Sequence, residues 1–129
     1  MLRTYSKSIT ATANTLIPFN TDKINIGTSI KHPTATNITV NTQGYYMVTI
    51  DTSFTGTAGL VSLQLYADGV AIPDAIITET IVADSYSNCS LTTIIKASRG
   101  NFNENATLTV IPTADLTISN IALGVNRVA

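Results

Sequence analysis

The sequence predicts an all-β fold, a two-sheet jelly-roll sandwich formed by a single domain. Apolar and polar residues alternate in short runs, and Gly, Pro, Asn and Asp separate these runs at the spacing of turns. No stretch has a helical period, a heptad or a Gly-X-Y repeat. The 129 residues can bury one core without disulfide bonds but are too few for a second domain. We therefore expect an N-terminal arm over residues 1–8 and one jelly-roll domain over residues 9–129.

The first part of the domain predicts two short strands. Residues 9–19, Ile-Thr-Ala-Thr-Ala-Asn-Thr-Leu-Ile-Pro-Phe, predict a first strand that Pro18 ends, because proline cannot continue a strand ladder. Residues 20–23 predict a turn, and residues 24–30 a short strand or an ordered loop. His32 precedes Pro33, which favours an extended loop there.

Residues 37–54 predict a β-hairpin at the centre of the fold. A short alternating strand leads into Gln43-Gly44, and glycine supplies the backbone freedom that a tight turn needs. In the strand that follows, the side chains alternate between two faces. Tyr46, Val48, Ile50 and Phe54 share one face, and Tyr45, Met47, Thr49 and Asp51 share the other.

Asp68-Gly69 predicts a second hairpin. Residues 55–59 form a flexible connection, and residues 60–66 then alternate up to this dipeptide, which favours a tight turn before the strand that Val70 opens. Residues 75–88 mix apolar and acidic residues and predict a strand followed by an exposed loop.

The C-terminal part predicts three strands, over residues 89–97, 106–111 and 116–125, with turns at residues 99–101 and 112–115. In the last strand the apolar positions change from even to odd numbers near Ser119 and Asn120. Either a β-bulge lies there, or the strand is buried on both faces and one face meets another subunit.

The composition predicts an oligomer. Charged residues make up 12% of the chain, about half the share of an ordinary soluble domain. The mean hydropathy is +0.26, and no stretch is suited to cross a membrane. A surface so poor in charge favours coverage by other subunits. The net charge of −1 and the scattered cations exclude a nucleic-acid partner. Residues 8–14 are too polar to form the core of a secretory signal, so we expect assembly in the cytoplasm.

No group of residues predicts catalysis or a cofactor. His32 has no nucleophile or orienting carboxylate near it in the sequence and is interpreted as a surface-loop residue. Cys89 is the only cysteine, which excludes an intrachain disulfide and a cysteine metal cluster. The acidic residues between 68 and 84 match no calcium loop, so we expect no metal. Tyr66 and Tyr86 are open to packing or to stacking on sugars.

The order of these features resembles that of the compact jelly rolls of the complement globular-head and tumour-necrosis-factor superfamily. The resemblance rests on residues 17–20 (Ile-Pro-Phe-Asn), on Gly44-Tyr45-Tyr46, on Asp68-Gly69-Val70 and on the closing strand. It is greatest to the C-terminal domain of the BclA-type collagen-like spore-surface glycoproteins and to small phage virion proteins built from that domain.

This resemblance implies ten short strands in two sheets and a compact homotrimer. The strands that start at Tyr45, Ala106 and Ser119 would be the inner ones. The implied trimer interface comprises Tyr45, Met47, Leu108, Val110, Ile121, Leu123 and Val125.

Our leading hypothesis is a non-enzymatic trimeric protein of the virion surface, a capsid decoration or head-fibre knob of a bacteriophage. We expect this protein to be assembled in the host cytoplasm and to contact the capsid or another virion protein. The alternative is a receptor- or glycan-binding module of a phage tail spike or of a cell or spore surface. Its ligand loops would carry Tyr66, Asp74, Glu79, Asp84 and Tyr86.

Overall fold

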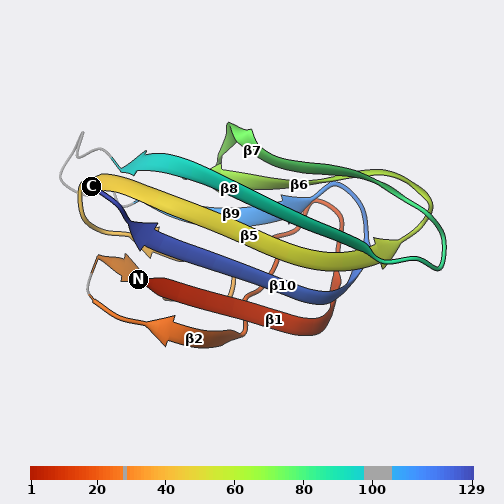
Figure 1. Cartoon of the computed structure of the whole chain (residues 1–129), viewed down its shortest axis with the longest axis horizontal. Coiled ribbons are helices and arrows are strands. Elements are labelled where there is room, and N and C mark those ends of the chain that lie inside the picture. The colour runs from red at the N-terminus through yellow and green to blue at the C-terminus, as the bar shows by residue number, and fades with distance from the viewer. Residues whose placement is uncertain (28, 98–105) are drawn as a thin grey trace.

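The computed structural model describes residues 1–27, 29–97 and 106–129, and these residues form ten strands in two antiparallel sheets of five (Figure 1). Sheet A has the order β2-β1-β10-β5-β8, and sheet B has the order β3-β4-β9-β6-β7. The strands are β1 Leu2–Ala11, β2 Thr21–Asn25, β3 Ile30–Lys31, β4 Ile38–Val40, β5 Gly44–Gly56, β6 Gly59–Ala67, β7 Val70–Ile81, β8 Ser87–Ala97, β9 Ala106–Pro112 and β10 Leu116–Arg127. The all-β sandwich prediction is therefore confirmed.

The core lies between the two sheets and is filled by the alternating apolar residues. On β5 the side chains of Tyr46, Val48, Ile50 and Phe54 are all at most 1% exposed, as the alternation predicts. Leu63 and Leu65 on β6 face them from sheet B. The buried phenol of Tyr46 donates a hydrogen bond to the Thr42 carbonyl at 2.6 Å, so its polar end is satisfied.

A β-bulge in β10 explains why the apolar positions of this strand change parity. The register with β5 shifts between Ile118 and Asn120, which places Ile118 and Ile121 on the same, buried side. The first of the two predicted explanations is confirmed, and the strand is not apolar on both faces. The parity change thus carries no information about another subunit.

The predicted N-terminal arm is wrong, because residues 2–11 form β1, which pairs with β10 and with β2. The polar character of this segment concealed the strand. Its inward residues include Thr4, whose hydroxyl donates to the Thr21 carbonyl at 2.9 Å, and Ser6, whose hydroxyl donates to the Pro18 carbonyl at 2.7 Å. These bonds allow hydroxyl groups to occupy buried positions of a strand.

The predicted strand over residues 9–19 is only partly correct, since β1 ends at Ala11. Ile17 and Phe19 reach the core from a loop, and the backbone N–H of Ile17 donates to the Val110 carbonyl. The turn predicted over residues 20–23 is largely part of β2, and residues 24–30 contain the end of β2 and the start of β3.

The predicted central hairpin is also wrong. β4 belongs to sheet B and β5 to sheet A, so these consecutive strands do not pair. Their apolar faces both point to the core, but from opposite layers of the sandwich. In contrast, the Asp68-Gly69 hairpin is confirmed: it joins the paired strands β6 and β7, and both residues have positive φ, 51° and 79°. The predicted turn at residues 99–101 lies outside the described residues.

Candidate functional site: the outer faces of the two sheets

None of the described residues belongs to a helix of the length and hydropathy that a membrane crossing requires. Among the same residues there is no group of three or more His, Cys, Asp and Glu side chains that could hold a metal ion. The outer faces of the two sheets carry the candidate functional features.

His32 lies in a loop as predicted, between β3 and β4, but its side chain is not at the surface, because it is only 6% exposed. Nδ1 lies 2.6 Å from Oδ1 of Asp22, and Nε2 lies 3.2 Å from the Ala35 carbonyl oxygen. The two ring nitrogens thus contact β2, through Asp22, and the loop between β3 and β4, through Ala35. This histidine has a structural role that the sequence separation of ten residues concealed.

The outer face of sheet A is built from side chains that alternate away from the core on β1, β10, β5 and β8. Cross-strand pairs place Arg3 beside Gly124, Gly124 beside Thr49, and Thr49 beside Thr92. One row further along, Tyr5 lies beside Ala122 and Ala122 beside Asp51. The centre of this face therefore carries small residues, which lets long side chains lie flat across β10.

Gly124 makes room for an ion pair across this face. A Cβ atom added to Gly124 would lie 2.9 Å from Oγ1 of Thr49 and 3.3 Å from Nη1 of Arg3. Arg3 passes over this position and places Nη2 3.4 Å from Oδ2 of Asp51. Because both side chains are partly solvated, the pair stabilises the fold by no more than about 1 kcal/mol.

One end of the outer face of sheet A is apolar. Met47 on β5 lies directly opposite Ile94 on β8, and Tyr45 lies opposite Lys96. Ile94 is 60% exposed and Tyr45 is 45% exposed, which is unusual for large apolar side chains so near each other. We call Tyr45, Met47 and Ile94 the apolar strip.

Five of the seven predicted interface residues cannot contact another subunit. Their side chains are at most 1% exposed in a single chain, so they belong to its own core: Leu108, Val110, Ile121, Leu123 and Val125. β9, predicted to be an inner strand, also lies in sheet B, apart from β5 and β10. Tyr45 and Met47 do lie on an outer face. The sequence analysis missed Ile94, whose signal is an apolar residue next in sequence to the buried Ile95.

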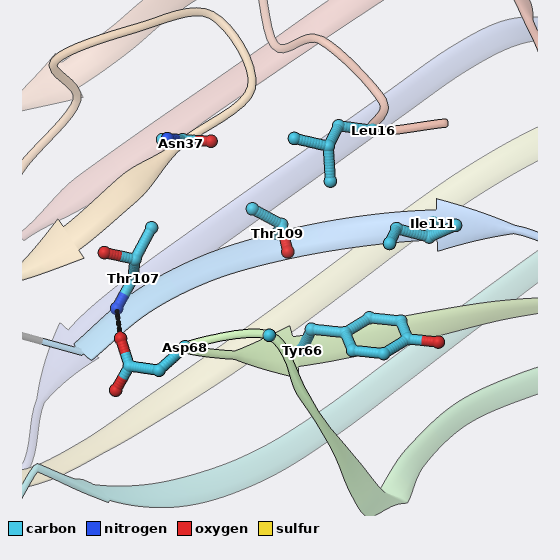
Figure 2. Close-up of a pocket in the computed structure, with 8 residues that line it drawn as sticks. Leu16, Asn37, Tyr66, Asp68, Thr107, Thr109 and Ile111 are labelled. Carbon is cyan, nitrogen blue, oxygen red and sulfur yellow. Dashed lines mark hydrogen bonds between the residues drawn. The ribbon is translucent and has the colours of Figure 1, made fainter. Parts of the chain in front are cut away.

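A shallow groove of about 580 Å³ lies on the outer face of sheet B (Figure 2). Tyr66 on β6 is directly opposite Thr109 on β9, and both line the groove. Asp68 is fixed at one end: its Oδ1 accepts the Thr107 N–H at 2.8 Å, and its own N–H donates to the Thr107 carbonyl at 2.9 Å. Asn37 lines the groove from the loop before β4. We call this the Tyr66 groove.

The structure does not bring the five predicted ligand residues together. Tyr66 lies in the groove, whereas Asp74 and Glu79 are on β7 and contact β8. Asp84 and Tyr86 belong to the segment between these strands, and Asp84 lines a different pocket beside Asp115. The groove residues that the prediction did not include are Leu16, Asn37, Asp68, Gly69, Thr107, Thr109 and Ile111.

Cys89 on β8 is a poorly reactive thiol. Burial raises its pKa above the ordinary value, and the carboxylate of Glu79, 3.7 Å from Sγ, raises it further by its negative charge and as a hydrogen-bond acceptor. The thiolate is the nucleophilic form, so this cysteine is mostly protonated and unreactive near neutral pH.

Glu79→Gln is expected to lower the pKa of Cys89, because it removes the negative charge and the acceptor that favour the thiol. In iodoacetamide labelling followed by mass spectrometry, the midpoint of the rate against pH should move to lower pH, with labelling about twofold to tenfold faster at neutral pH. Asp74→Asn, which alters a carboxylate that bonds Thr93 instead, is the control. An unchanged midpoint in Glu79→Gln would contradict this assignment.

Comparisons with known proteins agree with this fold. No curated protein sequence matches the chain. The globular domain of zebrafish complement 1qA protein has a TM-score of 0.76 at 10% identity, covering 99% of this chain and 96% of that one. Murine APRIL has a TM-score of 0.67 at 9% identity, with coverages of 95% and 96%. The PRD1 vertex protein P5 has a TM-score of 0.60 at 14% identity, with coverages of 95% and 93%. At such identities these likenesses show the fold alone, a jelly roll of the complement and tumour-necrosis-factor type.

The family comparison is more specific. The family described as the BclA C-terminal domain matches residues 2–122, which is almost the whole chain. This range begins at β1 and ends inside β10, so it contains nine complete strands and half of the last. The resemblance inferred from the sequence is confirmed, and the chain belongs to the BclA C-terminal domain family.

Proposed function

We propose that the chain forms a homotrimer that serves as a non-enzymatic surface module of a bacteriophage virion, as a capsid decoration or a head-fibre knob. Membership of the BclA C-terminal domain family supports a surface module. The fold likeness to a vertex protein supports a place on the outside of a particle. The outer face of sheet A is the observation that carries the trimer.

This face has the properties of a subunit contact. It extends over the four adjacent strands β1, β10, β5 and β8. Gly124 and Ala122 lie at its centre, and the apolar strip lies at one end. Aromatic residues and methionine are enriched in the cores of protein interfaces. Contact with further copies would remove the apolar strip from water, and three copies would close a ring by heterologous contacts.

The virion assignment is tested by quantitative mass spectrometry of purified particles from the source of the gene, with the major capsid subunit as the internal reference. Copies in the hundreds per particle are expected for a capsid decoration. A handful of copies would place the chain at a tail tip or spike and favour receptor binding. Absence from the particle would overturn the virion assignment, while leaving the trimer to be tested separately.

Glycan binding is a second candidate function, and the Tyr66 groove favours it. Sugars bind to protein sites that combine an aromatic side chain with a few fixed polar groups. Here Tyr66 supplies the ring, and Asp68, Asn37 and Thr109 supply a carboxylate, an amide and a hydroxyl group. Three such grooves on one trimer would gain avidity for a surface with many glycans.

Tyr66→Ala is expected to reduce glycan binding by about tenfold or more, because it removes the aromatic surface of the groove. A glycan array read with the labelled wild-type protein identifies the ligand, and titration calorimetry compares the variants. Tyr86→Ala, at an exposed position away from the groove, is the control and should bind normally. Equal binding by both variants would remove the Tyr66 groove from consideration.

A further inference from the structure

The charges of the chain are segregated along the sequence and in space. Between Lys31 and Lys96 there is no Lys or Arg, and this segment contains five acidic residues. In the fold, Arg3, Lys7 and Lys23 line one pocket of about 370 Å³ on the outer face of sheet A, together with Tyr5, Asn120 and Ala122. We call Arg3, Lys7 and Lys23 the basic patch.

The two lysines of the basic patch have no carboxylate partner in the part of the chain that the structure describes. The ion pairs there are Arg3 with Asp51 and His32 with Asp22. The ammonium group of Lys7 lies 5.9 Å from the centre of the Tyr5 ring, which keeps it over the face of the sheet. Arg3 is paired with Asp51, so the uncompensated positive charge of the patch is that of Lys7 and Lys23.

An acidic edge lies on the other side of the sandwich. β7 ends sheet B and β8 ends sheet A, and the two strands run along the same edge of the molecule (Figure 1). Contacts that bridge them involve Asp74, which accepts a hydrogen bond from Thr93 at 3.1 Å, and Glu79, which contacts Cys89. Asp84 lies in the turn between the strands. We call Asp74, Glu79 and Asp84 the acidic edge.

The basic patch and the acidic edge of one chain cannot neutralise each other. Arg3 and Lys7 lie on β1 and Lys23 lies on β2, which are three and four strand spacings from β8 in sheet A, roughly 14 and 19 Å. At physiological ionic strength, exposed charges at these separations are largely screened. A direct ion pair between these two surfaces therefore requires a second molecule.

We propose that the acidic edge of one copy docks on the basic patch of the next copy, which sets the head-to-tail order of the ring. This inference rests on the proposed homotrimer and adds the pair of surfaces that determines its register. Each copy uses two different surfaces, as a heterologous contact requires. β8 also carries one cation, Lys96. Lys96 lies beside the apolar strip, at the opposite end of β8 from the turn that contains Asp84. The apolar strip and the charged surfaces then act together: burial supplies affinity, and charge selects the orientation.

Charge reversal tests the proposal. Lys7→Glu with Lys23→Glu, and separately Asp74→Lys with Glu79→Lys, should each raise the trimer dissociation constant by about tenfold or more, because like charges then face each other. A chain that carries all four substitutions presents both surfaces with exchanged signs and should recover trimers. Lys31→Glu, at an exposed position on β3 of sheet B, reverses a charge outside both surfaces and outside the apolar strip, and is the control. Analytical ultracentrifugation measures each constant.

Neutral variants cover the case in which lysines at the acidic edge prevent folding. Asp74→Asn with Glu79→Gln keeps the size of the side chains but removes their charge. In this variant the trimer dissociation constant should change less with salt concentration than in the wild type. Two results would overturn the docking while leaving the trimer in place. One is a trimeric wild type whose trimer dissociation constant does not change with these substitutions. The other is a quadruple variant whose trimer dissociates more readily than that of either double variant. A wild type that stays monomeric would instead overturn the proposed trimer.

Discussion

Leu123→Asp is expected to unfold the chain rather than to dissociate a folded oligomer. Leu123 is 1% exposed on β10, opposite Ile50 of β5, and its side chain lies in the core between the sheets. A carboxylate there would be buried without a partner, and the cavity left by the leucine would remain partly empty. The free energy of unfolding should fall by more than about 4 kcal/mol.

Urea denaturation followed by circular dichroism measures this loss, with Leu123→Met as the control. The methionine conserves volume and apolar character and should cost less than about 1.5 kcal/mol. A Leu123→Asp chain that folds as a stable monomer would contradict the core assignment and would return Leu123 to the subunit interface that the sequence resemblance implied.

Ile94→Asp is expected to have the opposite outcome, a folded chain that no longer forms trimers. Ile94 is 60% exposed on β8 and faces Met47, so an aspartate remains in water in the isolated chain. In the trimer the same carboxylate would be buried within the apolar strip without a partner. We expect the trimer dissociation constant to rise by about a hundredfold or more, with the melting transition of the monomer retained.

The matched control for this variant is Leu60→Asp. Leu60 is 70% exposed on β6, in the other sheet, and its replacement introduces the same charge. It should leave the trimer intact. If Ile94→Asp were fully trimeric, or if Leu60→Asp dissociated the oligomer equally, the outer face of sheet A would not be the contact surface.

Alternation in the sequence predicted which side chains share a face, and these predictions hold on β5 and β6. Tyr46, Val48 and Ile50 are buried together, and Tyr45 and Met47 point the other way. Period-2 alternation follows directly from strand geometry, so it is local information. The tight turn at Asp68-Gly69 is local for the same reason.

The partners of each strand could not be predicted in this way. β4 and β5 follow each other in sequence but lie in different sheets, because an alternating strand fits either layer of a sandwich equally well. The sequence does not reveal the first strand because its buried Thr4 and Ser6 are polar, and the backbone carbonyls that accept their hydrogen bonds are 17 and 12 residues away. Such long-range hydrogen bonds leave no signal in a local window.

The interface prediction is wrong at five of its seven residues for a related physical reason. A sandwich strand near a subunit contact has one face in its own core and one face toward the neighbour, and the more apolar face is the core face. The resemblance implies that the closing strand is an inner one, and Leu123 and Val125 are apolar residues of that strand, but they lie on its core face. The true outer residues of that strand, Ala122 and Gly124, are small and were not recognised as a surface.

The mass of the native chain in solution, by sedimentation equilibrium at micromolar concentration, tests most directly whether sheet A forms a subunit contact. A trimer through sheet A predicts three times the 13.6 kDa of one chain, with dissociation to single chains in the Ile94→Asp variant. A wild-type mass of 13.6 kDa over the whole concentration range would contradict it.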